Sequence, residues 1–160
     1  MTEKLAAEAG QALLRLGKTL AVAESCSGGL IGHLITQISG SSEYFLGGVI
    51  SYSNQVKEEQ LGVPKEVLIE HGAVSQATAK AMAEGVRKLV RADFGLAVTG
   101  IAGPTGGSPE KPVGLTWIAL ATQSSSHTER HLFEGDRSQV KIHAAAAALQ
   151  LLLAHVESDD

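Results

Sequence analysis

Residues 19–38 read TLAVAESCSGGLIGHLITQI, and this stretch decides the fold. Its first part, from Thr19 to Ala23, is a short apolar run that predicts a buried strand. A polar turn over 24–29 follows, and the apolar segment from Leu30 to Ile38 predicts a helix. A strand, a glycine-rich turn and a helix in this order indicate an open α/β protein, in which such a turn lies at the carboxyl edge of the sheet.

The rest of the chain continues this alternation of strands and helices. The pattern predicts helices over 3–16, 54–61, 76–90 (with Ser75 as N-cap) and 137–156, and strands over 49–52, 94–99, 113–122 and 128–134. This order predicts a three-layer α/β/α sandwich. Because the last two strands follow each other closely, they can pair as a hairpin, so we expect a mixed, mostly parallel sheet. Residues 1–156 are expected to form a single domain, and 157–160 a flexible acidic tail.

The composition disfavours several classes of partner. Lysine and arginine total 13 against 17 acidic residues, a formal charge of −4, which argues against duplex binding but leaves room for a small anionic ligand. The N-terminus is not a signal peptide, and no apolar run is long enough to span a bilayer. The single cysteine, Cys26, fits a reducing compartment. We therefore expect a cytoplasmic protein with no nucleic-acid or membrane partner.

Metal and cofactor motifs are absent from the sequence. The six histidines are scattered without ligand spacing, and one cysteine cannot support a thiolate zinc cluster. The chain has no GxxxxGK[ST] loop and no GxGxxG in a βαβ context. The sequence therefore predicts no metal site and no cofactor.

The first candidate for chemistry is the turn Glu24-Ser25-Cys26-Ser27-Gly28-Gly29. It places two hydroxyls and a thiol at a predicted helix start, where free amides favour negative charge, and its glycines allow close approach of a ligand. The alternative is that Ser25 or Ser27 simply caps the helix. Cys26 alone is more typical of a small buried filler than of a nucleophile.

The second candidate is Tyr52-Ser53-Asn54-Gln55-Val56-Lys57, which follows a predicted strand. If a helix starts near Asn54, Lys57 lies one turn inside it and can point back toward the strand end. A lysine buried beside a serine can lose its charge and act as a general base. Taken alone, Lys57 is more typical of a solvated surface lysine.

Two further segments can hold a ligand. The loop from Thr99 to Gly107 carries four glycines and a proline, which suit close backbone approach, although a plain connector is the commoner use of such loops. In Gly135-Asp136-Arg137, at the start of the last helix, Asp136 is a candidate N-cap and Arg137 a candidate phosphate clamp. A surface arginine is the alternative for Arg137.

Six motifs in order make the chain resemble the CinA C-terminal domain family. They are 24–29, 52–57, Gly72-Ala73-Val74-Ser75, Gly100-Ile101-Ala102-Gly103-Pro104, Lys111-Pro112-Val113-Gly114 and Gly135-Asp136-Arg137. The match is closest to the PncC type, nicotinamide-nucleotide amidohydrolase, in its standalone form. The resemblance implies hydrolysis of the carboxamide of nicotinamide mononucleotide to nicotinate mononucleotide and ammonia, in pyridine nucleotide salvage. It also implies a homodimer. The family motif reads E-S-C-T-G-G, and here Ser27 stands in the threonine position.

On this resemblance we assign roles in a serine–lysine amidohydrolase. Ser25 is the expected nucleophile, with Ser27 second, and Lys57 is the base. The amides of Gly28 and Gly29 are expected to stabilise the oxyanion, and Tyr52 and Thr99 to orient the carboxamide or relay a proton. The expected substrate-binding residues are Glu24, Asn54, Arg137 and the loop glycines Gly100, Gly103, Gly106 and Gly107, with Arg137 and the loop on the phosphate. Glu24 can instead pair with Lys57 or anchor the turn.

Two other classes of function stay open on the sequence. One is a non-catalytic nucleotide-binding or regulatory module on the same fold, in which Lys57 and the serines are incidental. The other is an amidase that uses Cys26. Ammonia release from nicotinamide mononucleotide separates the first from an enzyme, and thiol alkylation separates the second.

Overall fold

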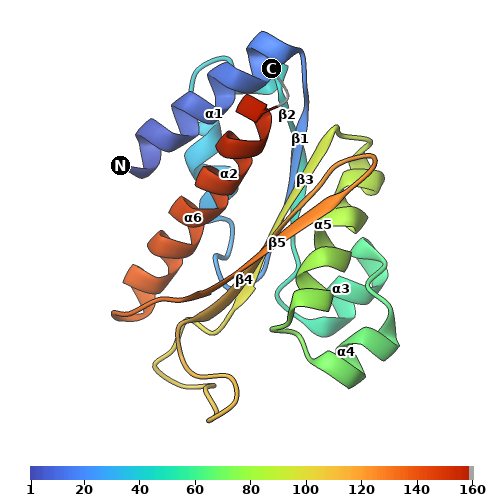
Figure 1. Cartoon of the computed structure of the whole chain (residues 1–160), viewed down its shortest axis with the longest axis vertical. Coiled ribbons are helices and arrows are strands. Elements are labelled where there is room, and N and C mark those ends of the chain that lie inside the picture. Colours follow the sequence, from blue (N-terminus) through green and yellow to red (C-terminus); the bar gives the residue numbers. More distant parts are fainter. Residues whose placement is uncertain (159–160) are drawn as a thin grey trace.

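A five-stranded open sheet forms the centre of the protein in a computed structural model that describes residues 1–158 (Figure 1). The strands are β1 (Leu20–Glu24), β2 (Phe45–Ile50), β3 (Phe94–Gly100), β4 (Leu115–Ala121) and β5 (Ser126–Leu132), in the order β2-β1-β3-β4-β5. β1 pairs in parallel with β2 and β3, whereas β3–β4 and β4–β5 are antiparallel. Four of these strands therefore share one direction and β4 opposes them. The α/β fold with a mixed sheet, predicted from the sequence, is confirmed.

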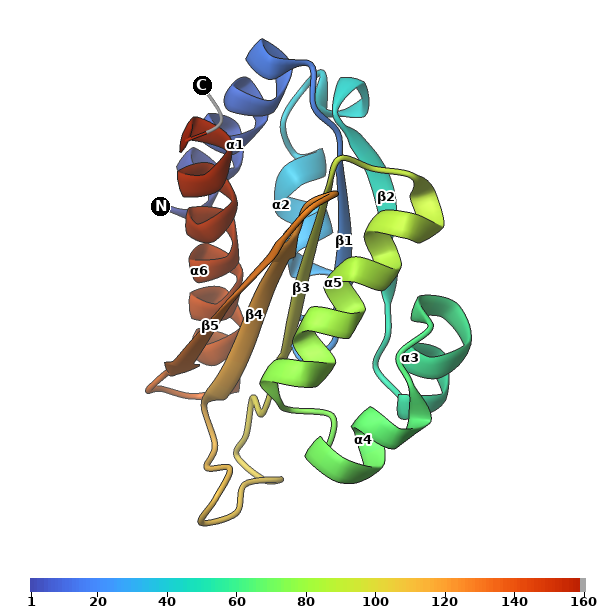
Figure 2. The same ribbon diagram turned by 45° about the vertical axis from the view of Figure 1, so that its right-hand side comes forward.

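Helices cover both faces of the sheet, as Figure 2 shows. One face carries α1 (Thr2–Leu16), α2 (Leu30–Thr36) and α6 (Arg137–Ser158), and the other carries α3 (Asn54–Leu61), α4 (Lys65–His71) and α5 (Gln76–Val90). A short 3-10 helix, η1 (Ser41–Glu43), precedes β2. The three layers are those of the predicted sandwich.

Alternation along β1 divides the core into two parts. Leu20 and Val22 point into the core beneath α1, α2 and α6, whereas Ala21 and Ala23 point into the core beneath α5. The alanine side is thin, so α5 lies close to the sheet. A Cβ added to Gly95 of β3 would stand 2.1 Å from a backbone oxygen of α5. Small residues therefore set the distance between α5 and the strands that carry the site.

Several element boundaries differ from those predicted. β2 begins at Phe45 rather than at residue 49, because its glycines hide the strand pattern. Glycine is required at position 48, since a Cβ there would stand 2.4 Å from the backbone oxygen of Val22. The α4 helix was not predicted. α6 extends through Glu157 and Ser158, which the sequence placed in a tail, and Asp159 and Asp160 lie outside the described residues.

The longest helix, α6, is long and apolar enough to cross a membrane by length and composition alone. Of its most apolar window, however, 56% is buried inside the protein, where α6 packs on α1 and the sheet. Its apolar character is therefore that of a core helix.

Candidate active site

The candidate site lies at the carboxyl end of β1, where the chain order of the sheet reverses. From β1 the chain passes to β2 on one side, and the next strand, β3, pairs with β1 on the other side. In open α/β sheets this switch point leaves a crevice beyond the strand ends. The Ser25 amide donates to the Val98 oxygen at 3.0 Å, and the Ser51 amide donates to the Glu24 oxygen at 2.7 Å. The segments that follow β1 and β2 are thereby fixed side by side at this edge.

Lys57 reaches Ser25 at this edge of the sheet. The Nζ of Lys57 donates to the Ser25 Oγ at 3.1 Å, to the Ser51 carbonyl at 2.7 Å and to the Tyr52 carbonyl at 3.4 Å. The side chain of Lys57 is 1% exposed, which contradicts the reading of a solvated surface lysine. Its helix, α3, begins where the Ser53 hydroxyl accepts the Val56 amide, so Lys57 lies in the first turn and points back toward the strand end as expected.

Burial makes Lys57 suited to accept a proton. Removal from water disfavours the ammonium form and lowers the pKa of Lys57 from its ordinary value. Within residues 1–158 no carboxylate forms an ion pair with it that would restore the charge. The neutral amine is therefore easier to reach here than at an exposed lysine, beside a hydroxyl that can give up its proton.

Glu24 anchors the turn, and its predicted contact with the substrate stays a prediction. Its two carboxylate oxygens accept the Ile31 amide at 2.9 Å and the Gly32 amide at 3.0 Å, which caps the start of α2. The N-cap residue of α2 is Gly29, with no side-chain cap of its own. The alternative in which Ser25 or Ser27 caps this helix is therefore wrong. Of the expectations for Glu24, anchoring the turn fits the structure, and pairing with Lys57 does not.

The turn supplies fewer free amides than predicted. The Gly28 amide donates to the Ser25 carbonyl at 3.1 Å inside the turn, so it is not free to bind an oxyanion. The Gly29 amide has no acceptor among the described residues, and this part of the expected oxyanion site is available. The dipole of α2 also adds little stabilisation for an oxyanion, because the Glu24 carboxylate already neutralises the start of that helix.

The two remaining side chains of the turn differ in character. The Ser27 hydroxyl is buried, and its oxygen has no hydrogen-bond partner within the described part of the chain. An unsatisfied buried hydroxyl is costly, so a bound ligand or water at this position would stabilise it. Burial raises the pKa of the Cys26 thiol to about 12, so the thiolate that a cysteine nucleophile needs is scarce at neutral pH.

Arg137 connects three segments that meet at the mouth of the site. Its Nη1 donates to the Gly103 carbonyl at 2.7 Å, and its Nη2 donates to the Tyr52 hydroxyl at 3.0 Å. Asp136 caps α6, because its carboxylate accepts the Gln139 amide at 2.9 Å. The structure thus brings Arg137, Tyr52 and the glycine-rich loop together, while both terminal nitrogens of Arg137 already hold protein acceptors.

Thr99 takes a structural position. Its hydroxyl donates to the Ala73 carbonyl at 2.7 Å, and its side chain is 1% exposed. This bond fixes the 72–75 segment to the end of β3, and the Thr99 proton is not available to a carboxamide. Asn54, by contrast, is exposed on the first turn of α3, and its side chain makes no hydrogen bond within residues 1–158.

Three of the four loop glycines are required by close packing against neighbouring segments of the protein. A Cβ on Gly100 would stand 2.7 Å from the Thr116 Oγ1 and 3.1 Å from the Cys26 Sγ. A Cβ on Gly103 or Gly107 would collide with Val113, while a Cβ on Gly106, whose φ is 91°, would stand at an ordinary contact distance of 3.6 Å from Ile101. These contacts account for the glycines without a ligand, so their predicted phosphate contacts stay a prediction.

One residue at the site was missed by the sequence analysis. Lys141 lies one turn after Arg137 on α6, and its Nζ is 3.6 Å from where a Cβ on Gly28 would stand. The sequence signal was the i, i+4 spacing of two cations at a helix start. It was overlooked because the alanine-rich stretch that follows made the segment look like core alone.

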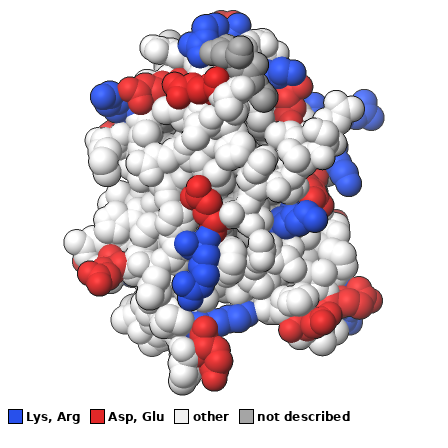
Figure 3. Space-filling model, in the orientation of Figure 1, with Lys and Arg blue, Asp and Glu red and all other residues white. Residues whose placement is uncertain are grey.

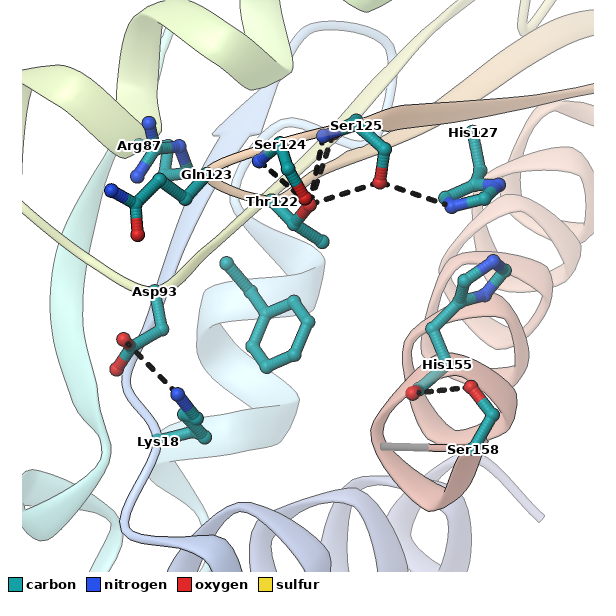
Figure 4. Close-up of a pocket in the computed structure, with 11 residues that line it drawn as sticks. Lys18, Arg87, Asp93, Thr122, Gln123, Ser124, Ser125, His127, His155 and Ser158 are labelled. Carbon is teal, nitrogen blue, oxygen red and sulfur yellow. Dashed lines mark hydrogen bonds and ion pairs between the residues drawn. The ribbon is translucent and has the colours of Figure 1, made fainter. Parts of the chain in front are cut away.

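A larger cavity at the opposite end of the sheet has different chemistry. Figure 4 shows this pocket of about 480 Å³ beside the β4–β5 turn. Several of its polar groups already have partners: Lys18 pairs with Asp93 at 3.8 Å, and His155 donates from Nδ1 to the Leu151 carbonyl at 3.0 Å. Its lining contains no serine–lysine pair, and it lies at the amino ends of β1 and β3, away from the switch point. The candidate active site is therefore the Ser25–Lys57 pair at the switch point.

The charges on the surface are mixed in sign. On the face shown in Figure 3, basic and acidic side chains lie along the margins and in a mixed group near the middle, with uncharged surface between them. This face carries no continuous basic area of the kind that duplex-binding surfaces use. Within residues 1–158, no group of three or more histidine, cysteine, aspartate or glutamate side chains is arranged to hold a metal ion.

The protein is thus an open α/β/α protein with a buried serine–lysine pair at the switch point of its sheet. Residues 2–156 match the model of the CinA C-terminal domain, and the chain belongs to that family. It is 55% identical over 135 residues to a CinA-like protein of Syntrophus aciditrophicus and 51% identical over 146 residues to one of Salinibacter ruber. These matches cover 84% and 91% of the chain but 32% and 35% of the relatives, so the chain spans about a third of their length.

Solved structures agree with the family assignment. The competence/damage inducible protein CihA from Agrobacterium tumefaciens superposes with a TM-score of 0.93 at 40% identity, covering 96% of this chain and 94% of that one. A CinA superfamily protein from Klebsiella pneumoniae superposes with a TM-score of 0.95 at 32% identity, covering 99% of both chains.

Proposed function

We propose that the protein is an amidohydrolase that converts nicotinamide mononucleotide to nicotinate mononucleotide and ammonia. The observation that supports this reaction type is the 3.1 Å contact between the Lys57 Nζ and the Ser25 Oγ, both of which belong to buried residues. An amide is a poor electrophile, and its hydrolysis needs an activated oxygen nucleophile of this kind. The choice of substrate follows from the family resemblance of the ordered motifs.

The mechanism begins with proton transfer from the Ser25 hydroxyl to the neutral amine of Lys57. The Ser25 Oγ attacks the carboxamide carbon, and the negative charge that forms on the carbonyl oxygen is held by the free Gly29 amide. Lys57 then returns its proton to the nitrogen, the carbon–nitrogen bond breaks, and ammonia leaves. Water hydrolyses the resulting ester, which gives the carboxylate product and restores Ser25. Each step uses only groups of this chain, the substrate and water.

The two alternative classes make different demands on the same geometry. A binding module has no need for a lysine that is buried without a carboxylate partner, because burying an ammonium group is costly. A cysteine amidase needs a thiolate, whereas burial raises the pKa of Cys26 to about 12. A serine nucleophile with Lys57 as its base uses the buried lysine and needs no thiolate.

The direct test measures ammonia release from nicotinamide mononucleotide by purified protein treated with a chelator. We expect nicotinate mononucleotide as the second product and no turnover by the Ser25→Ala variant. Formation of free nicotinamide and ribose 5-phosphate would assign the wrong bond. Activity lost on chelation and restored by a divalent metal would contradict a serine–lysine mechanism that needs no metal. We also propose that the protein is a homodimer, which light scattering would check. We expect no nucleic-acid ligand, which a binding titration with duplex DNA would check.

A further inference from the structure

Lys141 is a cation at the site without a counter-ion. Its side chain is half-buried on α6 and makes no hydrogen bond or ion pair with any residue in 1–158. The ammonium group faces the Ser25 turn, 3.6 Å from the position that a Cβ on Gly28 would take. Its charge also reaches the Cys26 thiol, on which it acts together with Lys57. A bound anion would give this ammonium group a charge-assisted hydrogen-bond acceptor.

Gly28 brings the backbone of the Ser25 turn close to this ammonium group. Its φ is 61°, a conformation that side chains other than glycine rarely adopt, and a Cβ here would stand at an ordinary contact distance of 3.6 Å from the Lys141 Nζ. The ammonium group therefore lies beside the polar turn that carries Ser25, where it can meet a negatively charged group of a ligand bound at that turn.

The neighbouring cation, Arg137, is less available. It lies four residues before Lys141, on the same side of α6, and its guanidinium already donates to the Gly103 carbonyl and to the Tyr52 hydroxyl. The Glu24 carboxylate likewise occupies the start of α2, so that helix end does not attract an anion. Among the described groups around the Ser25 turn, the positive charge that is free to meet an anion belongs to Lys141.

We propose that Lys141 binds the phosphate of the substrate and so makes the site prefer a nucleotide to the corresponding nucleoside. Arg137 then acts mainly as a positioning residue that holds the loop and Tyr52 at the mouth of the site. The link to nucleotide hydrolysis rests on the proposed function, whereas the phosphate contact itself does not depend on turnover. The two are therefore tested separately.

The kinetic test compares Lys141→Gln with the wild-type protein on nicotinamide mononucleotide and on nicotinamide riboside, which lacks the phosphate. Loss of a charge-assisted contact is expected to lower kcat/KM for the nucleotide at least about tenfold, chiefly through KM, with a change below about twofold for the riboside. Lys141→Arg should keep most of the activity on the nucleotide. Lys88→Gln, an exposed lysine near the far end of α5, is the matched control and should change neither substrate. Equal losses on both substrates would overturn the phosphate role.

The binding test uses ribose 5-phosphate and isothermal titration calorimetry, so it needs no catalysis. The wild-type protein, Ser25→Ala and Lys88→Gln should bind this probe alike, and Lys141→Gln at least about tenfold more weakly. Such a result without any ammonia release would leave the phosphate site standing while the proposed function failed. Equal binding by the wild type and Lys141→Gln, or no binding by either, would overturn the role of Lys141 even if the amidase activity were found.

Discussion

Lys57→Met replaces the buried ammonium group of the site by an apolar side chain of similar length, and it tests the electrostatics on which the mechanism depends. In the folded protein, burial lowers the pKa of Lys57, whereas in the unfolded chain this pKa is about 10.4. Between these two values the unfolded chain binds one proton more than the folded protein. The free energy of unfolding therefore rises with pH over this window.

The size of this pH dependence follows from the difference of one bound proton between the unfolded and folded states. Across the window, the wild-type free energy of unfolding should rise by up to about 1.4 kcal/mol per pH unit relative to that of Lys57→Met. Below the lowered pKa both states are protonated, so the difference between the two proteins becomes constant. Above about pH 10.4 both states are neutral, and the wild type keeps its full advantage. That advantage includes about 1–3 kcal/mol for the Ser51 carbonyl, which loses its 2.7 Å bond in the variant.

The assay is urea unfolding at a series of pH values from 6 to 10, with the wild type, Lys57→Met and the exposed-lysine control Lys88→Met. Other titrating groups are common to all three proteins and cancel in the differences. The control should parallel the wild type at every pH. If Lys57→Met also parallels the wild type, the pKa of Lys57 is not lowered in the folded state, and its use as a base at neutral pH would be refuted.

Three further predictions concern the residues of the same crevice. Ser25→Ala and Lys57→Met should each remove most turnover, and the double variant should be little worse than either single one, because the two groups share one step; additive losses in kcat would indicate independent roles. Full activity in Ser25→Ala together with an inactive Ser27→Ala would instead move the nucleophile two residues along the turn. Cys26→Ala should keep substantial activity, and the folded wild type should resist iodoacetamide, since burial raises the pKa of this thiol to about 12; rapid alkylation with loss of activity would revive the cysteine mechanism. Gly100→Ala should lower the free energy of unfolding by about 1–3 kcal/mol, because its Cβ would stand 2.7 Å from the Thr116 Oγ1 and 2.9 Å from the Leu115 carbonyl; an unchanged melting temperature would show that the loop moves aside without cost.

Local sequence patterns predicted the main elements of the fold. The apolar run of β1 and the helix over Asn54–Leu61 carry their own signals, and together they place Ser25 and Lys57 at strand ends. What the sequence could not indicate is how close the two groups come. The 3.1 Å contact joins residues that lie 32 positions apart in the sequence. It depends on the pairing of β1 with β2.

Residues whose roles depend on long-range partners were predicted least well. Thr99 belongs to a motif of the site, yet its hydroxyl is used by Ala73, which lies 26 positions away. The loop glycines looked like ligand contacts because glycine permits close approach by any neighbour, and here the neighbour is often the loop itself. The start of β2 was hidden for a related reason, since its glycines interrupt an apolar pattern that only the packing against Val22 explains.

The position of Glu24 decides whether the serine–lysine pair can work. Glu24 and Lys57 are both buried, at 2% and 1% exposure, and both belong to the segments that form the crevice. If the carboxylate contacted the ammonium group, the pair would hold Lys57 in its charged form, and the lysine could not take the serine proton. Instead, the two amides at the start of α2 hold the carboxylate and satisfy it. A helix start that would ordinarily attract an anionic ligand is thereby used to keep the buried acid away from the buried base. In our proposal, the charge that meets the substrate phosphate therefore comes from another element, α6.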